Sequence, residues 1–222
     1  MNKIFHLAII PDGNRRYSAK HNIPLEKVYE TSIDKLLQIA EWCRKENIKI
    51  LTVYGFSLEN WRRSISERKL LFGIFKKKSE NFLNKKQKKE IKIKFIGQIY
   101  RFPKSLRYLL QRVEKETEKC GDFELNVLLN YTGKKEILSA VNRILKEKKT
   151  KISEEEFKNY LWLKKEPDLI IRTSGEMRLS GFLPFQSVNS RLHFEKKLFP
   201  EFEKEDFLRI VRNLQRKPET QN

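Results

Sequence analysis

Short apolar segments of strand character alternate with amphipathic helical segments along almost the whole chain. Five segments read as strands, each bounded by turn-forming residues: residues 5–10, 48–56, 91–96, 123–129 and 169–171. Apolar residues at helical spacing mark four further stretches: residues 33–43, 106–113, 137–145 and 207–214. This alternation is typical of strand–helix–strand units with right-handed crossovers. We predict an α/β fold, with a central, mostly parallel β-sheet flanked by helices.

Length and composition limit the class of protein. A chain of 222 residues fits one domain, so we expect a single domain over residues 1–222. Hydrophobic residues make up 39% of the sequence, which is too many for a disordered basic tail. Lysine and arginine number 48 against 29 acidic residues, a formal net charge of +19. This charge favours an anionic partner: nucleic acid, an acidic membrane surface or a phosphorylated small molecule.

Cysteine content and hydropathy indicate the expected compartment. The two cysteines, Cys43 and Cys120, form no Cys-x-x-Cys pair, so the sequence offers neither a disulfide framework nor a cysteine zinc site. A cytoplasmic location is the expectation. Residues 4–11 read as a strand because no small-residue cleavage site follows them. No segment approaches the roughly 18 apolar residues of a membrane span, so membrane contact is expected to be peripheral or through a lipid substrate.

Polar clusters follow four of the five predicted strands. They occupy residues 12–16, 57–63, 130–133 and 172–180. Ligands of open α/β sheets bind beyond the carboxyl ends of the strands, so we expect these clusters to converge on one rim.

Two of the clusters have the chemistry of phosphate cradles. Gly13 permits close backbone approach beside Arg15 and Arg16, and Asp12 suits a hard cation, although Asp-Gly-Asn is also ordinary turn chemistry. Arg172 and Arg178 flank a Thr-Ser-Gly segment, an arrangement that a structural turn does not need. Two phosphate-binding sites are therefore expected.

Common nucleotide and hydrolase signatures are missing from the sequence. It contains neither GxxxxGK[ST] nor GxGxxG after a strand, which makes ATP and NAD poor candidates. His6, His21 and His193 lack metal-ligand spacing, and no Ser-His-Asp arrangement is evident. One carboxylate, an asparagine and two cationic cradles suit the electrostatic departure of diphosphate better than hydrolysis.

At these residues the chain resembles the cis-prenyltransferases, the undecaprenyl diphosphate synthase family. Four motifs of that family match in order: residues 6–17, 52–63, 126–136 and 168–180. Arg15, which stands where many bacterial members have Gly, and the compact length look closer to the archaeal and eukaryotic branches. The resemblance implies a Mg²⁺-dependent condensation of isopentenyl diphosphate onto an allylic prenyl diphosphate primer, giving a long-chain polyprenyl diphosphate with cis double bonds. It also implies a hydrophobic tunnel for the product.

The resemblance assigns roles residue by residue. Asp12 would be catalytic and would bind Mg²⁺, and Asn60 matches the proton acceptor, although an amide is a poor base by itself. Isopentenyl diphosphate would be held by Arg172, Arg178 and Ser180. The allylic diphosphate would be held by Gly13, Asn14, Arg15, Arg16, Tyr17, Ser57, Glu59, Trp61 and Arg63.

A helix between the second and third strands would line the tunnel, or else serve as ordinary core. Its apolar residues are Leu70, Leu71, Ile74, Phe75 and Phe82. The lysine-rich segment at residues 85–89 reads as a solvated connection without chemistry.

Several positions depart from the family pattern. Arg191 replaces a Glu that contributes to Mg²⁺ binding, so we expect it either to contact diphosphate or to weaken the metal site, unless Glu195 takes over. Leu25, Tyr29 and Ser32 replace Arg, His and Gly, which predicts altered primer binding. Residues 215–218 lack the Arg-x-Gly that completes some members' sites across a dimer interface.

Three hypotheses follow. The first is an active cis-prenyltransferase, a homodimer or a heteromer, that binds no nucleic acid and is cytoplasmic or peripheral to a membrane. The second is a degenerate subunit that supports a catalytic partner. The third is a basic nucleic-acid-binding protein, which explains the charge but not the ordered polar clusters. The intact Asp12 motif favours the first.

Overall fold

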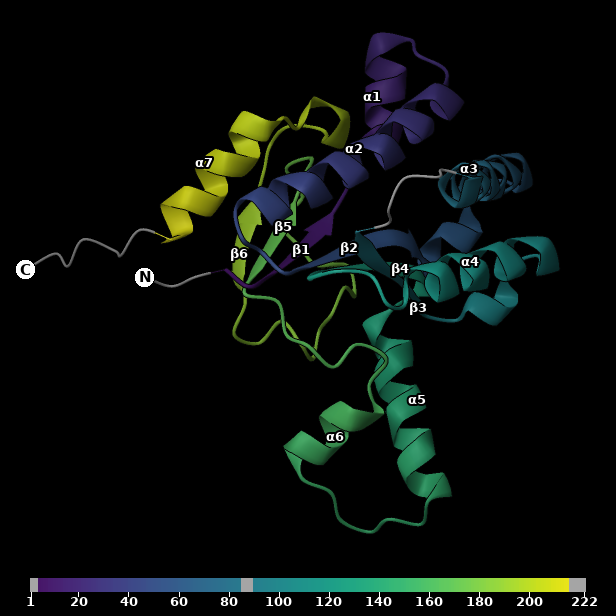
Figure 1. The fold of residues 1–222 in the computed structure, drawn as a ribbon, viewed down its shortest axis with the longest axis vertical. Coiled ribbons are helices and arrows are strands. Elements are labelled where there is room, and N and C mark those ends of the chain that lie inside the picture. Colours follow the sequence, from purple (N-terminus) through teal and green to yellow (C-terminus); the bar gives the residue numbers. More distant parts are fainter. Residues whose placement is uncertain (1–3, 85–89, 216–222) are drawn as a thin grey trace, which may run out of the picture.

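A six-stranded parallel sheet forms the centre of the molecule (Figure 1). The computed structural model describes residues 4–84 and 90–215, so the predicted connection at residues 85–89 and most of the tail at 215–218 lie outside the described residues. Neighbouring strands follow the order β3-β4-β2-β1-β5-β6, and every pairing is parallel. The strands are β1 (His6–Ile10), β2 (Ile50–Ser57), β3 (Ile91–Ile96), β4 (Phe123–Tyr131), β5 (Leu169–Arg172) and β6 (Arg191–Phe194). The predicted α/β class with a parallel sheet is confirmed.

Seven α-helices connect and flank the strands in the described parts of the chain. They are α1 (Asn14–His21), α2 (Leu25–Lys45), α3 (Ile65–Asn84), α4 (Lys104–Thr117), α5 (Gly133–Lys146), α6 (Glu154–Tyr160) and α7 (Lys204–Gln215). Short 3-10 helices occupy Leu58–Arg62, Ile99–Arg101 and Phe199–Glu201. None of the α-helices within the described ranges is long and apolar enough to cross a bilayer.

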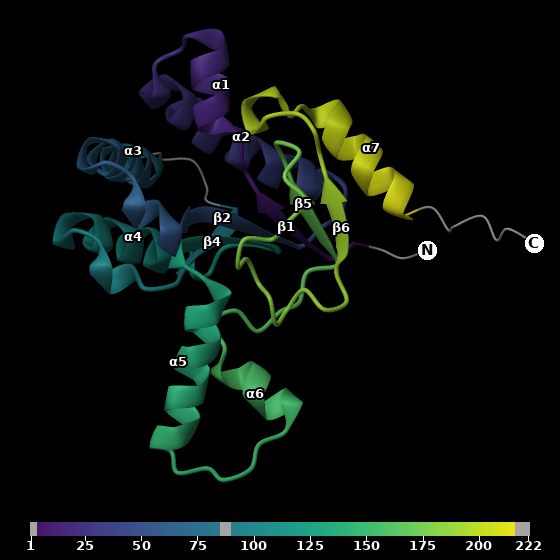
Figure 2. The same cartoon turned by 180° about the vertical axis from the view of Figure 1, so that it is seen from behind.

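Alternating residues of β1 divide the core between the two faces of the sheet. Leu7 and Ile9 pack in one cluster with apolar residues of α2, α4 and α7. Ala8 and Ile10 pack in another with Phe182, which belongs to a non-helical segment. The second face is therefore covered mainly by turns, while α5 and α6 extend away from the sheet in both views (Figures 1 and 2).

Strand β6 and helices α1 and α6 were not predicted from the sequence. Strand β6 is a short edge strand whose four residues are all partly exposed or exposed, so it lacks the apolar run that marks the other strands. Helix α1 buries none of its residues and shows no apolar stripe. The residues expected in a turn after β1, from Asn14 onward, therefore lie in the first turns of a helix.

Candidate active site

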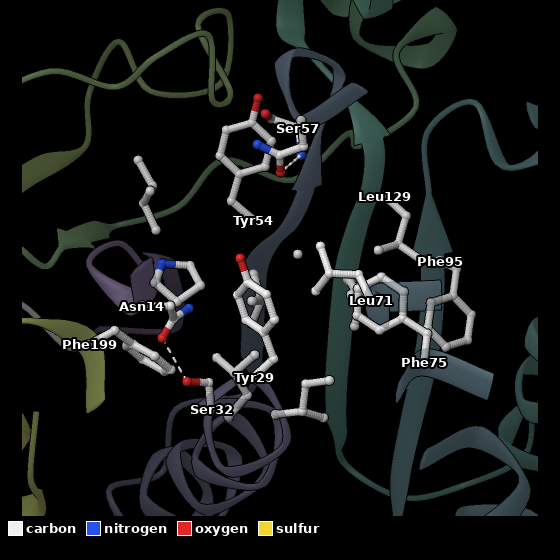
Figure 3. A pocket seen from close by; sticks show the side chains of 18 of the residues that line it. Asn14, Tyr29, Ser32, Tyr54, Ser57, Leu71, Phe75, Phe95, Leu129 and Phe199 are labelled. Atoms are coloured by element: carbon white, nitrogen blue, oxygen red, sulfur yellow. Dashed lines mark hydrogen bonds between the residues drawn. The ribbon is translucent and has the colours of Figure 1, made fainter. Parts of the chain in front are cut away.

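A cavity of about 370 Å³ opens beside the carboxyl end of the sheet. It runs between α2, α3 and strands β2, β3 and β4. Its polar end contains Asp12, Asn60 and Arg172, and its other end is apolar. Figure 3 shows Asn14, Ser32 and Phe199 on one side of the view, Leu71, Phe75, Phe95 and Leu129 on the other, and Tyr29 between them. Three of the four predicted polar clusters contribute residues to this cavity.

Asp12 is fixed by the loop that leaves β1. Its Oδ1 accepts a hydrogen bond from the Gly13 N–H at 2.7 Å, and its backbone N–H donates to the Thr173 hydroxyl at 2.9 Å. Gly13 has φ of +110°, and a Cβ there would lie 2.9 Å from Cδ2 of Leu198. Any other residue would be strained and would collide with Leu198. The glycine therefore sets the position of the carboxylate.

Arg172 joins this carboxylate to the segment after β5. Its Nη2 donates to Oδ2 of Asp12 at 2.9 Å, and its Nη1 donates to Oγ of Ser180 at 2.8 Å and to the carbonyl oxygen of Arg178. The residue is only 4% exposed, and its buried Nε has no hydrogen-bond partner among the described residues. Buried donors normally find a partner, so this guanidinium suits an anionic ligand.

Arg16 makes a second link between the same two segments. Its guanidinium donates to the backbone oxygen and the hydroxyl of Ser174, at 3.2 and 2.5 Å, and lies 3.7 Å from Asp12. Two separate phosphate-binding cradles were predicted from the sequence, whereas these contacts join them into one cluster. The pairing brings residues about 160 positions apart into one charged cluster, which spacing along the chain does not reveal.

The local charges keep Asp12 ionised. Burial acts to raise the pKa of Asp12, but hydrogen bonds from Arg172 and Ser174, with the guanidinium charge, outweigh it and hold the pKa below its usual value. The site therefore presents the ionised carboxylate of Asp12 beside several cationic or neutral donors at neutral pH.

The residues after Gly13 occupy the start of α1. Asn14 lines the cavity, and its Oδ1 accepts a 2.7 Å hydrogen bond from the Ser32 hydroxyl (Figure 3). Arg15 and Arg16 are exposed in the first turn, where backbone N–H groups favour anions. Tyr17 stacks near His21, with ring centroids 4.3 Å apart, and does not line the cavity.

The 3-10 helix Leu58–Arg62 carries the predicted residues that follow β2. The N–H of Ser57 donates to Oδ1 of Asn60 at 3.0 Å, so the amide oxygen proposed as a proton acceptor is already engaged (Figure 3). Ser57, Glu59 and Asn60 line the cavity. Trp61 does not: its indole N–H donates to Asn130 at 2.6 Å, and its ring lies among other aromatic rings.

Asn130 explains why the predicted cluster at residues 130–133 does not reach the cavity. Its side chain accepts from Trp61 and donates to the Gln98 carbonyl at 3.0 Å, which makes it a structural clamp. Gly133, in the same cluster, packs where a Cβ would collide with Pro184. Residues 130–133 were expected at the rim with the other clusters, and the structure places them outside the cavity.

Helix α3 supplies part of the apolar end. Leu71, Phe75 and Phe82 line the cavity, as the tunnel hypothesis predicts, whereas Leu70 and Ile74 pack in the neighbouring core. The sheet and α4 complete the apolar wall with Ile93, Phe95, Leu110, Val113, Leu125, Val127 and Leu129. These residues were predicted as strand and helix core and not as tunnel lining, because each follows the ordinary pattern of a core strand or helix.

The side chains at the polar end of the cavity fit a divalent cation that takes most of its ligands from the substrate. No group of three or more His, Cys, Asp or Glu side chains that could hold a metal occurs in residues 4–84 and 90–215. Asp12 is an ionised carboxylate facing the cavity, which Glu59 also lines, and Mg²⁺ often binds through one or two carboxylates together with substrate phosphates.

Comparison with known proteins decides the family. The profile described as "Putative undecaprenyl diphosphate synthase" matches residues 10–221. The chain belongs to the undecaprenyl diphosphate synthase family of cis-prenyltransferases. Within this family it is 39% identical to an isoprenyl transferase of Thermotoga maritima, over 93% of this chain and 91% of the relative. It is 40% identical to a geranylgeranyl-diphosphate-specific tritrans,polycis-undecaprenyl-diphosphate synthase of Pyrococcus horikoshii, over 96% and 84% of the two chains.

Solved cis-prenyltransferase structures share the whole architecture. Lavandulyl diphosphate synthase from Lavandula x intermedia, in complex with dimethylallyl diphosphate, superposes with a TM-score of 0.88 at 25% identity, covering 97% of both chains. A "probable undecaprenyl diphosphate synthase" from Campylobacter jejuni gives a TM-score of 0.81 at 30% identity, covering 99% of both.

Arg191 was expected at the metal site, where the family pattern has a Glu, but in this fold it lies far from Asp12. It starts β6 opposite Leu169, at the amino end of the strands, whereas Asp12 follows their carboxyl ends. Its guanidinium donates to the carbonyl oxygen of Leu214, near the end of α7. The expectation that Arg191 lies beside Asp12 is wrong within one chain, because strand direction separates them by roughly 15 Å.

Glu195 does not replace the missing acid either. Its Oε2 is 2.8 Å from the Arg209 guanidinium, and its Oε1 accepts from the Lys197 N–H at 3.2 Å. Burial acts to raise its pKa, but these hydrogen bonds outweigh burial and lower the pKa of Glu195. The carboxylate is committed to Arg209 and does not line the cavity.

Proposed function

We propose that this protein condenses isopentenyl diphosphate with an allylic prenyl diphosphate primer and builds a long polyprenyl chain with cis double bonds. The observation that carries this proposal is one cavity with an ionised Asp12 and a buried Arg172 at one end and an apolar wall at the other. Diphosphate groups suit the charged end, and a hydrocarbon chain suits the apolar end. Membership in the cis-prenyltransferase family supports the reaction class.

We propose geranylgeranyl diphosphate as the primer. Several archaeal relatives at 37–40% identity are geranylgeranyl-diphosphate-specific synthases, and the match spans 95–96% of this chain. Arg15, in place of the Gly of many bacterial members, agrees with that branch.

The two diphosphates would occupy neighbouring parts of the polar end. The primer diphosphate would bind at the start of α1, near Gly13, Asn14 and Arg16, with Arg63 beside it. Isopentenyl diphosphate would bind at Arg172, Arg178 and Ser180, which line the same cavity. Arg178 is exposed and pairs with Glu176, so its guanidinium is able to swing onto a ligand.

Asp12 would hold Mg²⁺ together with diphosphate oxygens. When bound, the ion neutralises negative charge that develops as diphosphate departs. Arg172 and Arg16 hold the carboxylate of Asp12 in place and add positive charge beside the departing group.

The reaction breaks the allylic C1–O bond, forms a bond from that carbon to the terminal alkene carbon of isopentenyl diphosphate, and releases a proton and diphosphate. Oδ1 of Asn60 accepts from the Ser57 N–H and so holds the loop after β2, and because an amide is a poor base the released diphosphate is the better proton acceptor. The growing chain would extend past Leu71 and Phe75 toward the apolar wall.

The test is turnover by the purified chain alone. Labelled isopentenyl diphosphate, Mg²⁺ and primers of two to four isoprene units should give butanol-extractable polyprenyl product, with the greatest rate for geranylgeranyl diphosphate. Absence of product with every primer would support a degenerate subunit. Salt-dependent binding to random DNA would favour the nucleic-acid hypothesis.

The expectation of a homodimer rests on the family resemblance, and that of a cytoplasmic, membrane-peripheral location rests on cysteine content, hydropathy and a lipid substrate. Light scattering during size-exclusion chromatography tests the first, and flotation with anionic vesicles tests the membrane contact.

A further inference from the structure

Helix α2 presents two buried polar side chains to the cavity on an otherwise apolar stripe. Tyr29 and Ser32 are each 5% exposed and lie three residues apart, so they share one face of the helix. The same face continues into the cavity with Ile33, Leu36 and Leu37. Buried hydroxyls on an apolar stripe need partners, and both find them on other segments of the site.

Ser32 determines how the Asn14 amide faces the cavity. Its hydroxyl donates to Oδ1 of Asn14 at 2.7 Å, and Figure 3 shows the amide nitrogen turned away from Ser32. No described residue accepts a hydrogen bond from that nitrogen, although Asn14 lines the cavity. The serine therefore leaves both amide hydrogens available to an anionic ligand.

Tyr29, Arg63 and Glu67 each contact the other two, and Tyr29 thereby holds Arg63 in place. Its hydroxyl accepts from Nη1 of Arg63 at 3.0 Å and donates to Oε1 of Glu67 at 2.7 Å, while Glu67 lies 3.2 Å from the same Nη1. Burial and the Glu67 carboxylate raise the pKa of Tyr29 against the opposing Arg63 charge, so the hydroxyl stays protonated and can play both parts. Both contacts use Nη1, which leaves Nη2 for a ligand.

We infer that Tyr29 and Ser32 are positioning residues for the primer diphosphate. One turn of α2 fixes the distance between a donor at the start of α1, Asn14, and a donor from the segment after β2, Arg63. Donors held in place before binding lose less conformational freedom when the ligand arrives. The inference rests on the proposed function only for the identity of the ligand. The hydrogen bonds from Ser32 to Asn14 and from Arg63 to Tyr29 position the two donors whatever the ligand is.

The first experiment removes each hydroxyl with little change of shape. Ser32→Ala and Tyr29→Phe should each weaken geranylgeranyl diphosphate binding and raise its KM about three- to tenfold, the effect of losing the hydrogen bond that positions Asn14 or Arg63. Binding of inorganic diphosphate, measured by calorimetry with Mg²⁺, should weaken equally because only the head group is involved. The KM for isopentenyl diphosphate should stay unchanged. Thr31→Val is the matched control, since the Thr31 hydroxyl bonds only to carbonyls of α2.

The second experiment separates positioning from support of the fold. In an Asn14→Ala background, Ser32→Ala should cause no further loss of affinity, because the serine acts through the amide. A full additional loss there, or equal effects of Ser32→Ala on both substrates, would overturn the inference. Binding of both probes without turnover would refute the proposed function alone, and a wild type that binds neither probe would refute both.

Discussion

Replacing Arg172 by Ala should impair the use of both substrates, not of isopentenyl diphosphate alone. The guanidinium is buried, lies where the second diphosphate is proposed to bind, and donates to the Asp12 carboxylate at 2.9 Å. A hydrogen bond to a charged group contributes about 1.5–3 kcal/mol, which corresponds to about a 10- to 150-fold loss of kcat/KM. We expect a loss of this size when either substrate is varied. Arg172→Lys should recover little, because it keeps the charge without the planar fork.

The assay is the initial rate of labelled isopentenyl diphosphate incorporation, with each substrate varied in turn at fixed Mg²⁺. Arg178→Ala is the control: its side chain is 64% exposed and its carboxylate partner is Glu176, so its effect should be confined to the KM for isopentenyl diphosphate. A loss in Arg172→Ala that appears only with isopentenyl diphosphate would show two independent cradles and refute the reasoning.

The pH profile gives a second readout of the same variant. Because the Arg172 guanidinium lowers the pKa of Asp12, wild-type Asp12 stays ionised to a lower pH than an ordinary aspartate. Removal of the guanidinium should raise this pKa and move the acidic limb of kcat/KM to higher pH. An unmoved acidic limb would show that Asp12 does not control it.

Three further outcomes are expected. Asp12→Ala should abolish turnover and leave the melting temperature near that of the wild type, because the carboxylate lies at a partly exposed rim; near-normal Mg²⁺-dependent activity would exclude it from the mechanism. Burial lowers the pKa of His6 from 6.5 to about 4, so the unfolded chain binds the extra proton and wild-type stability should fall by about 2 kcal/mol between pH 7.5 and 5. Urea titrations of His6→Gln should lack that part of the slope, and identical slopes would contradict the assignment. Arg191→Glu should leave the Mg²⁺ titration of activity unchanged but reduce stability by about 1 kcal/mol, because an anion replaces the donor to Leu214 at the end of α7; a shifted Mg²⁺ curve would place Arg191 in the site after all.

Local pattern determined most of the sheet and the chemistry of its rim. Strands β1 to β5 are short, largely apolar segments, interrupted by lysines in β3 and by Glu124 and Asn126 in β4, and they are recognisable without any partner. The parallel arrangement follows from the helices between them. The cluster at Asp12 and the cluster at Arg172 were predicted because charged residues and glycines directly follow two of these strands. These signals lie in residues that are adjacent in sequence, so they can be recognised without knowledge of the tertiary structure.

Tertiary structure decided which polar residues meet. The pairing of Arg172 with Asp12 and the bond from Ser32 to Asn14 depend on how β5 and α2 pack around β1. The family resemblance likewise suggested that Arg191 belongs to the metal site, yet the direction of β6 places it at the opposite end of the sheet. Hydrogen bonds and ion pairs act over a few ångströms in space, and only the folded chain fixes those distances.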